Sequence, residues 1–327
     1  MVKSRWWMRL ETVLNAAILE LEQDELRIED LAVLLEKAEK YDKSVAPAPT
    51  PPVAARPRKL SASAVEKLMR DPYGVYAEYI LKLKPLDDLE QKADYRDLGN
   101  LVHKVLENFG KKYDTQYPDN AAEILKQMVE MEFENCNFAL EKQAFWRPKV
   151  EKMMDWIAAN EAIYRKEIAR IYTEVWGRFF IDDVPGGRFE IYAKADRVDR
   201  TIDGKINIID YKTGSARKET EVRKGYAPQL PIEGLIAVEG GFDGIEKADV
   251  DSLMYWRLGD KVTDIKNDMA DLLQNTKDRI TKLVNLYDFE STGYLSRPNP
   301  KEAPSYSDYE HLARVKEWSV KSDGEEG

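Results

Sequence analysis

The stretch RFEIYAKADRVDRTIDGKINIIDYKTG, residues 188–214, carries the clearest structural signal in the chain. β-branched and aromatic residues form a strand-like run on each side of Asp203-Gly204, and this dipeptide favours a tight turn between two strands. Alternation with a period of two places Asp210 and Lys212 on one face of the second strand. The stretch therefore predicts an antiparallel hairpin that holds a carboxylate and a lysine side by side.

The register of this hairpin decides which residue faces Asp210. A turn whose tip is Asp203 sets Asp196 directly opposite Asp210. Asp196 shares its strand face with Tyr192 and Lys194. A turn centred between Asp203 and Gly204 instead shifts the pairing by one residue and puts the two aspartates on opposite faces of the sheet. A functional role for the pair requires the first register.

The flanking sequence extends the hairpin into a small sheet between helices. RIYTEVWGRFFIDD, residues 170–183, is a further β-branched and aromatic run, and residues 251–258 predict one more strand. Apolar residues at three-and-four spacing predict helices in residues 61–81 with a break at Pro72, 98–113, 121–170, 227–238 and 261–287. We therefore expect an α+β domain with a helical half, a small sheet and further helix.

Two segments precede this domain. Residues 1–43 have the apolar periodicity of one or two short amphipathic helices. Residues 44–59 are rich in proline, which excludes a helix or a central strand and predicts a semi-rigid linker. The expected organisation is a helical remnant of an upstream region in 1–43, a linker in 44–59, and the main domain in 60–327.

The composition narrows the class of protein. With 327 residues, of which 43% are hydrophobic, the chain can build a substantial core. No apolar stretch reaches the roughly 18 to 20 residues of a membrane helix, and the start MVKSRWWMRLETVL is too charged for a signal peptide. We therefore expect a cytoplasmic protein that does not associate with a membrane.

The counts of particular residues restrict cofactors and ligands. One cysteine, Cys136, and two histidines exclude a cysteine-rich zinc or iron–sulfur site, so a metal would be held mainly by oxygen atoms. The chain has no G-x-x-x-x-G-K-[ST] loop, so we expect no ATP site. The net charge of −10 argues against general polyanion binding. DNA contact and simple solvation both stay open for the local basic clusters, formed by Lys59, Arg217, Lys218, Arg223 and Lys224.

The paired aspartates point to metal chemistry. Two carboxylates this close repel each other, and a hard divalent cation such as Mg²⁺ is the usual reason to keep both ionised. A nearby lysine, here Lys212, can then steady the charge that develops on a phosphate under attack. This combination suits phosphodiester hydrolysis, although an aspartate and a lysine at the end of a strand can also form a plain surface salt bridge.

Four ordered motifs strengthen the hydrolytic interpretation. They are LSASAVEKLMRDPYGVYAEYIL, DLGNLVHKVLE, AKADRVDRTIDGKINIIDYKTG and APQLPIEG, and YSDYEHLARVKEW follows near the C-terminus. Together they resemble the RecB-type nuclease domains of the PD-(D/E)XK superfamily, in particular the C-terminal nuclease region of alphaproteobacterial AddB. The resemblance implies a PD-(D/E)XK restriction-endonuclease-like core, in which helices and a large helical insertion flank a small mixed sheet.

The same resemblance assigns roles to individual residues. It implies that Asp196 and Asp210 are metal ligands and that the main-chain carbonyl of Tyr211 completes part of the coordination. Lys212 would be the catalytic lysine. His103, in the motif GNLVHKVLE, would reach the metal from a helix.

Two further residues match acidic and amide positions of the family. Glu174 occupies a place where related nucleases carry an acidic catalytic residue, and Gln229 would orient water or DNA from a helix after the site. A solvent-facing strand carboxylate and an ordinary helix-face amide remain the alternatives for Glu174 and Gln229.

The resemblance also implies an activity and its partners. We expect a Mg²⁺-dependent deoxyribonuclease, with Mn²⁺ as a possible substitute, that acts as an exonuclease on DNA. Its setting would be the resection of double-strand breaks and recombinational repair, together with an AddA-like helicase-nuclease partner. Two other interpretations stay open, namely a non-catalytic nuclease-fold scaffold or DNA-binding module, and a stand-alone RecB- or Cas4-like exonuclease.

The chain departs from the family at one conspicuous point. Many AddB-like nucleases carry a cysteine before the Pro-Tyr that here follows Asp71, and three more near the C-terminus complete an iron–sulfur cluster. The resemblance therefore implies a branch without the cluster, in which packing between the early helices and the C-terminal helix replaces it. The chain is also short for the family, so it is expected to be a fragment, an excised domain or the product of a truncated gene.

Overall fold

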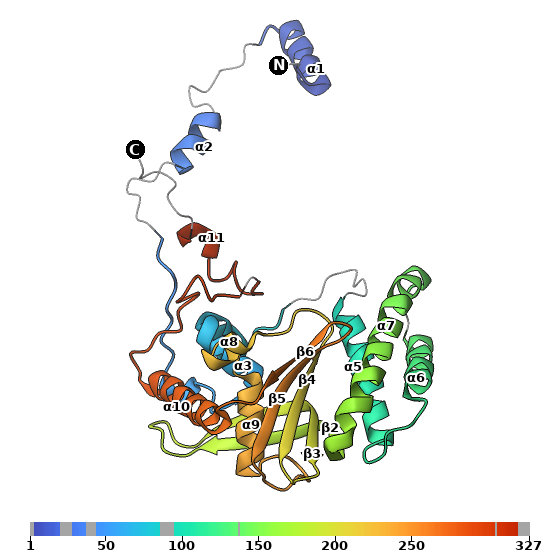
Figure 1. The fold of residues 1–327 in the computed structure, drawn as a ribbon. Helices are drawn as coiled ribbons and strands as arrows, with labels where there is room; N and C mark the ends of the chain where they lie inside the picture. Colours follow the sequence, from blue (N-terminus) through green and yellow to red (C-terminus); the bar gives the residue numbers. More distant parts are fainter. Residues whose placement is uncertain are drawn as a thin grey trace, which may run out of the picture. The chain divides into compact units, whose positions relative to one another are not determined.

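The computed structural model describes residues 3–19, 28–36, 44–85, 95–136, 138–304 and 306–319 (Figure 1). Contacts divide the chain into two compact units, Met1–Val45 and Ala46–Gly327. The first unit contains α1 (Arg5–Ala16) and α2 (Ile28–Glu36), as the apolar periodicity predicted. The rest of the predicted helical segment, residues 1–2, 20–27 and 37–43, lies outside the described residues.

A mixed six-stranded sheet forms the centre of the second unit. Its strand order is β1-β3-β4-β5-β6, and β2 also pairs with β3. The β1–β3 and β4–β5 pairs are parallel, and the other pairs are antiparallel. The strands are β1 (Lys59–Ser61), β2 (Ile168–Ile181), β3 (Phe189–Thr201), β4 (Ile206–Lys212), β5 (Val250–Arg257) and β6 (Lys261–Ile265). The predicted mixed sheet within a helical frame is confirmed.

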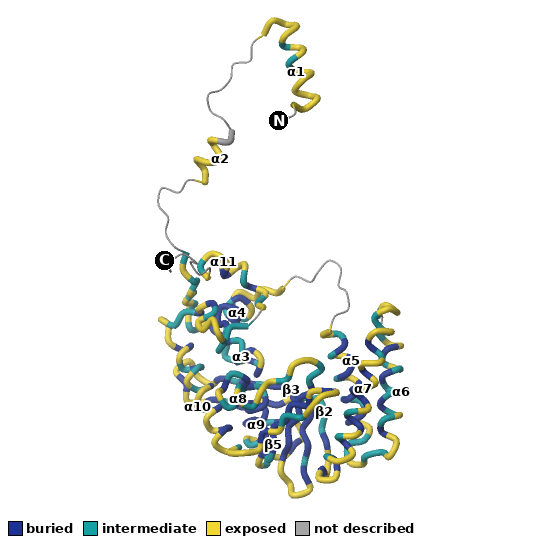
Figure 2. Tube along the Cα trace, turned by 45° about the horizontal axis from the view of Figure 1, so that its top comes forward, coloured by how far each residue is buried: buried dark blue, intermediate teal, exposed yellow. Residues whose placement is uncertain are grey.

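Helices cover both faces of the sheet (Figures 1 and 2). One apolar core lies between the sheet and α3, α9 and α10, and a second lies between the sheet and α5, α6 and α7. Because both of its faces are covered, β4 is buried along almost its whole length. The helices are α3 (Ala62–Arg70), α4 (Pro72–Val75), the π-helical turn η2 (Tyr76–Ile80), α5 (Tyr95–Lys112), α6 (Ala121–Asn135), α7 (Leu140–Tyr164), α8 (Glu219–Arg223), α9 (Gln229–Glu239), α10 (Met269–Asp288) and α11 (Val315–Trp318).

Local sequence explains where the first helices of this unit begin. Ser61 caps α3, because its Oγ accepts a hydrogen bond from the main-chain N–H of Ala64 at 3.1 Å. Pro72 occupies the first turn of α4, where its missing N–H leaves no hydrogen bond unmade. The predicted break at Pro72 is therefore confirmed.

The prediction of one helix over residues 261–287 is wrong at its start. Residues 261–265 form β6, an edge strand that pairs with β5, and α10 begins only at Met269. Gly259, with a φ of 79°, makes the turn between the two strands possible. Pairing with β5 therefore overrides the helical periodicity of this segment.

Residues 46–58 of the proline-rich segment pack on the rest of the second unit, and the role of residues 44–59 as a linker stays a prediction. Arg56 is buried, and its guanidinium bonds main-chain carbonyls at and after the end of α10, those of Tyr287, Phe289 and Glu290. The main-chain N–H of Tyr294 donates to the carbonyl of Pro49 at 2.9 Å. Residues 46–58 therefore belong to the surface of the domain.

A small apolar cluster joins the early helices to the C-terminal segment. We call it the C-terminal clamp; its members are Tyr73, Ala77, Tyr309, Ala313 and Val315. Beside it, Ser307 donates a hydrogen bond from Oγ to Oδ2 of the buried Asp71 at 3.1 Å. The expectation that packing joins these segments is confirmed by this contact.

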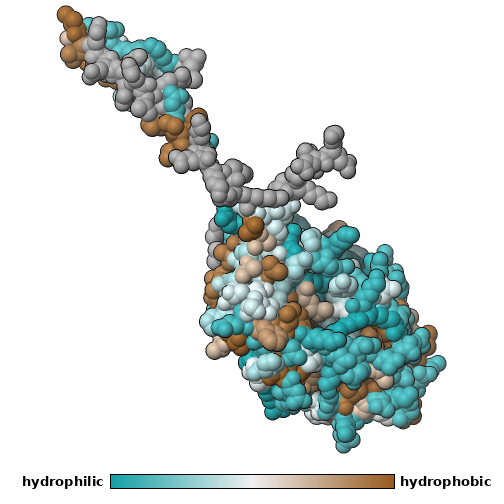
Figure 3. Space-filling model, turned by 90° about the vertical axis from the view of Figure 1, so that its left-hand side faces the viewer, coloured by the Kyte–Doolittle hydropathy of each residue, from teal (hydrophilic) through white to brown (hydrophobic). Residues whose placement is uncertain are grey.

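The surface of the second unit agrees with a chain in which 34% of the residues are charged. Figure 3 shows one side of the molecule as largely hydrophilic, with separate apolar patches between the polar regions. Among the residues that the structure describes, no helix combines the length and apolar composition that a membrane span needs.

Candidate metal and catalytic site

Strands β3 and β4 form the predicted hairpin in the register that a functional role requires. Arg197 pairs with Ile209 as the last registered pair, so Asp196 and Asp210 occupy the next positions on the two strands. The main-chain N–H of Tyr211 then donates a hydrogen bond to Oδ2 of Asp196 at 2.9 Å. This bond ties the carboxylate of one strand to the backbone of the other.

Three potential metal-ligating side chains meet beside this hairpin. Helix α5 carries His103, whose Nδ1 lies 3.5 Å from Oδ1 of Asp196. Strand β2 contributes Glu174. Within the described part of the chain, these three form a group whose ligand atoms all lie within 4.8 Å of one another. Two carboxylates and one imidazole suit a divalent cation such as Mg²⁺ or Mn²⁺, so the donor set fits the expected metal.

The backbone is distorted at Glu174. The registered pairs of β2 with β3 run through Thr173 and Val175 but skip Glu174. Glu174 has a φ of 55°, in the left-handed region that costs a residue with a side chain about 1–2 kcal/mol. Residues held in such conformations are concentrated at functional sites, where the surrounding structure imposes them. Glu174 therefore joins the group through a strained position.

Burial and charge act against each other in the His103–Asp196 pair. Burial disfavours the imidazolium, but the interaction with Asp196 outweighs it and raises the pKa of His103. Burial also disfavours the Asp196 carboxylate, but His103 and the N–H of Tyr211 outweigh it and lower the pKa of Asp196. Asp196 therefore stays ionised and available to a cation.

Asp210 lies on β4, the other strand of the hairpin, and interacts with Lys212 and Gln229. Its Oδ1 accepts hydrogen bonds from Lys212 Nζ at 2.8 Å and from Gln229 Nε2 at 2.9 Å. Asp210 is only 1% exposed, and this burial, with the charge of Asp196, raises its pKa to about 6 despite Lys212. In return, the carboxylate outweighs the burial of Lys212 and raises the pKa of its ammonium group.

The three-residue group and the predicted ligand set share His103 and Asp196. Sequence reasoning grouped Asp210 with His103 and Asp196, whereas the structure places Glu174 with these two residues. Asp210 lies outside this group, and its Oδ1 accepts hydrogen bonds from Lys212 and Gln229. A metal-ligand role for Asp210 stays a prediction, and so does one for the carbonyl of Tyr211.

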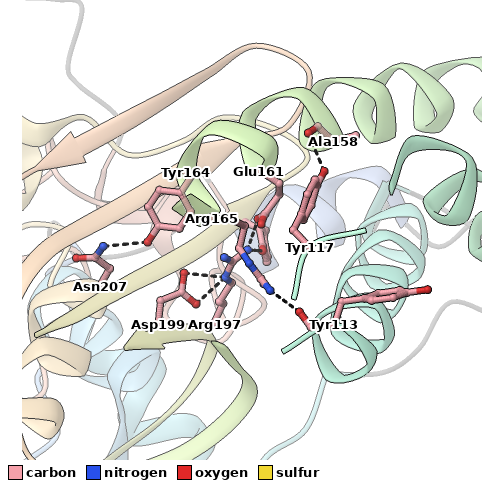
Figure 4. Close-up of polar contacts among 10 residues, drawn as sticks. Tyr113, Tyr117, Ala158, Glu161, Tyr164, Arg165, Arg197, Asp199 and Asn207 are labelled. Carbon is pink, nitrogen blue, oxygen red and sulfur yellow. Dashed lines mark hydrogen bonds and ion pairs between the residues drawn. The ribbon is translucent and has the colours of Figure 1, made fainter. Parts of the chain in front are cut away.

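A buried ionic network supports the site from behind (Figure 4). Arg197, next to Asp196 in sequence, bonds Asp199 at 2.7 and 3.0 Å and Glu161 of α7. Its NH1 also donates to the hydroxyl of Tyr211 at 3.0 Å. Residues on both strands next to the candidate ligands are therefore fixed to helix α7.

Sequence reasoning missed one residue of the site, Glu233. It lies one helical turn after Gln229 on α9, and Gln229 Nε2 donates to its Oε1 at 3.3 Å. Glu233 is 1% exposed, and its Oε2 has no hydrogen-bond partner among the described residues. Burial, with the charges of Asp210 and Asp196, raises its pKa well above the ordinary value. The i, i+4 spacing from Gln229 was the available signal.

Open space adjoins the ligand group. A cavity of about 440 Å³ is lined by residues of α5, β2 and β3 and by Thr213, and the three candidate ligands His103, Glu174 and Asp196 lie in its wall. The basic clusters noted in the sequence are mostly neutralised by neighbours, because Lys59, Arg217 and Arg223 form ion pairs with Glu190, Glu66 and Glu219. They therefore do not form an unopposed cationic surface.

Comparisons with known proteins give the family of the fold. The model of the PD-(D/E)XK nuclease superfamily matches residues 59–309. An uncharacterised protein of Rickettsia bellii is 32% identical over 187 residues, and one of Rickettsia typhi is 33% identical over 192 residues. Each alignment covers 57% of this chain and 22% of the relative, so the chain spans about a fifth of the length of these curated proteins.

A more distant relative has a functional name. This protein of Clostridium kluyveri, named as a subunit of an ATP-dependent helicase/deoxyribonuclease, is 28% identical over 309 residues. The alignment covers 86% of this chain and 25% of that protein. The similarity thus extends over nearly the whole chain but over a quarter of the relative.

Proposed function

The chain belongs to the PD-(D/E)XK nuclease superfamily, and we propose that it is a divalent-metal-dependent deoxyribonuclease that hydrolyses phosphodiester bonds. The observation that carries the proposal is the convergence of His103, Glu174 and Asp196 within 4.8 Å, beside the Asp210–Lys212 pair. Mg²⁺ is the proposed cation, with Mn²⁺ as a substitute. When bound, the cation would supply charge stabilisation to a phosphate under attack.

The chain's own residues would hold and orient the reacting groups. His103, Glu174 and Asp196 would hold the cation, joined by Asp210. Lys212 carries a fixed positive charge beside Asp210, where it would stabilise negative charge that develops on the phosphate. Gln229 fixes the orientation of Asp210 through its amide hydrogen bond.

The biological setting is proposed from the relative named as part of an ATP-dependent helicase/deoxyribonuclease. We place the chain as the nuclease region of an AddB-like protein that acts with an AddA-like helicase-nuclease on DNA ends. Exonucleolytic resection of double-strand breaks in recombinational repair would be its role. The similarity over 86% of the chain supports this setting over a stand-alone nuclease.

The activity can be tested on linear DNA labelled at either end, with Mg²⁺, Mn²⁺ or a chelator. Wild type is expected to cleave only with the metal, and Lys212→Ala is expected to lower the rate by a factor of about 100 or more. The control is Lys152→Ala, which removes an exposed lysine of α7 outside the site and is expected to cleave like wild type.

Equal cleavage by wild type and Lys212→Ala would refute the assigned site. A protein that binds DNA but cleaves none with either metal, even with the partner helicase present, would instead be a DNA-binding scaffold of the nuclease fold.

A further inference from the structure

An exposed aromatic pair lies next to the candidate site. Trp176 on β2 is 52% exposed, and its ring centroid lies 6.2 Å from that of Tyr192 on β3 at an interplanar angle of 35°. Gly177, the next residue, faces α9, because a Cβ there would meet Ile236 at 2.5 Å. Trp176 therefore projects from the opposite face of the sheet. Trp176 differs from an isolated exposed aromatic residue in that a second ring, that of Tyr192, lies beside it on the same surface.

Basic side chains accompany both rings. Lys59 Nζ lies 4.8 Å from the centroid of Tyr192, and Lys194 Nζ lies 5.9 Å from that of Trp176. Each lysine also bonds a carboxylate, Glu190 or Glu174, which holds its ammonium group beside the ring. Because both lysines are paired, the aromatic faces are the part of this surface that can bind a single strand, since bases stack on such faces regardless of sequence.

Between Tyr192 and Arg197, one edge of β3 has no registered partner among the described strands. β1 pairs with β3 only as far as Tyr192, and β4 pairs with β3 only from Arg197. A cavity of about 240 Å³ lies at this interval, and its lining includes both Trp176 and Tyr192 as well as Gln229 and Glu233 of α9. The aromatic pair and the Gln229 end of the site therefore share one hollow.

The positions along the strands give the distance to the ligand group. Tyr192 precedes Asp196 by four residues, and Trp176 follows Glu174 by two. At about 3.3 Å per residue these separations are roughly 13 and 7 Å, which is a span of a few nucleotides. A single DNA strand whose bases stack on Trp176 and Tyr192 can thus place a phosphate at the metal-ligating group.

We propose that Trp176 and Tyr192 form a base-stacking subsite that holds single-stranded DNA next to the metal-ligating group. The inference rests on the proposed nuclease function and extends it to the form of the substrate. Bases of a single strand have free faces, whereas those inside a duplex are stacked on each other. Trp176 would therefore select single strands or frayed ends.

The test measures binding separately from cleavage. The full chain, in EDTA, is titrated into fluorescein-labelled strands of about 15 nucleotides, one of thymidines and one fully abasic with the same backbone. Fluorescence anisotropy gives the Kd of wild type, Trp176→Ala and Trp176→Phe. Phe145→Ala is the matched control, because Phe145 is an aromatic residue that is 69% exposed on α7 and outside this surface.

We expect Trp176→Ala to weaken binding of the thymidine strand by about 5- to 150-fold, the range that one lost stacking contact gives. Trp176→Phe should keep most of the affinity, and Phe145→Ala should match wild type. Wild type should bind the abasic strand more weakly than the thymidine strand, and this difference should be smaller for Trp176→Ala, which keeps only Tyr192. Binding of a blunt duplex should not depend on Trp176.

Two results would overturn the subsite. One is an unchanged Kd of Trp176→Ala for the thymidine strand, which would leave the aromatic pair as a surface for a protein partner. The other is an equal loss of affinity by Trp176→Ala for the thymidine and abasic strands, which would show that Trp176 does not contact the bases. If wild type binds the thymidine strand with the expected dependence on Trp176 but cleaves no DNA with Mg²⁺ or Mn²⁺, the subsite stands and the proposed nuclease activity fails.

Discussion

Replacement of Asp210 by asparagine should stabilise the metal-free protein. The pKa of Asp210 rises from its ordinary value of 3.8 to about 6 in the folded state. The shift is roughly 2.2 pKa units, and each unit corresponds to about 1.36 kcal/mol. An ionised Asp210 therefore lowers the free energy of unfolding by about 3 kcal/mol. The neutral amide of asparagine would remove this loss but would also deprive Lys212 of its partner. We therefore expect a gain of about 1 to 3 kcal/mol at a pH of about 7.5.

The sign follows from proton binding. Between pH 3.8 and about 6 the folded state binds the Asp210 proton more tightly than the unfolded state does, so the stability of wild type falls as the pH rises through this window. Above a pH of about 6, Asp210 is ionised in both states, and the free energy of unfolding has lost the full contribution. The difference between Asp210→Asn and wild type should therefore be small near a pH of about 4 and largest above about 6.5.

Urea denaturation in EDTA at several pH values gives the required free energies of unfolding. The control is Asp182→Asn, which removes an exposed carboxylate and should change stability little. Saturating Mg²⁺ should reverse the order, because the ion stabilises only the protein that binds it. An Asp210→Asn variant that is less stable than wild type in EDTA at a pH of about 7.5 would refute the reasoning.

Three further outcomes are expected. In urea denaturation, Arg197→Met should lower the free energy of unfolding by about 3–5 kcal/mol, because it leaves the buried carboxylates of Glu161 and Asp199 without their cation. A loss below about 1 kcal/mol would contradict this. Glu174→Gly and Glu174→Ala should both weaken Mg²⁺ binding in calorimetry. Only glycine adopts the left-handed backbone without strain, so Glu174→Gly should be more stable than Glu174→Ala by about 1 kcal/mol, and equal stability would argue against strain. Gly177→Val should destabilise the protein by about 1–3 kcal/mol in thermal melts, since a side chain there meets α9 and Phe242, and an unchanged melt would show that the packing can adapt.

The hairpin could be derived from the sequence because its signals are local. Alternation and the Asp203-Gly204 turn left two registers open, and the one in which Asp196 faces Asp210, which a functional role requires, is the one observed. The helices around it followed from apolar periodicity and from Pro72 in the same way.

The features that the sequence did not reveal depend on contacts between distant segments. β6 forms because β5 offers it an edge, and residues 46–58 are held by the end of α10. Nothing in the local sequence indicates the left-handed φ of Glu174, so its place beside His103 could be suggested only by resemblance to other nucleases. Glu233 was missed because its burial depends on how α9 lies against the sheet.

The C-terminal clamp sets the order in which the domain can be completed. Beside the clamp, Ser307 donates a hydrogen bond to Asp71, which lies 236 positions earlier in the chain. Closing a loop of that length has a high entropic cost before any contact rewards it, unless the sheet between the two segments has already folded and brought them close. During synthesis, residues 307–315 leave the ribosome long after the helices that they contact. We therefore expect the clamp to form late in folding and the helices that it contacts to open first when the protein is destabilised.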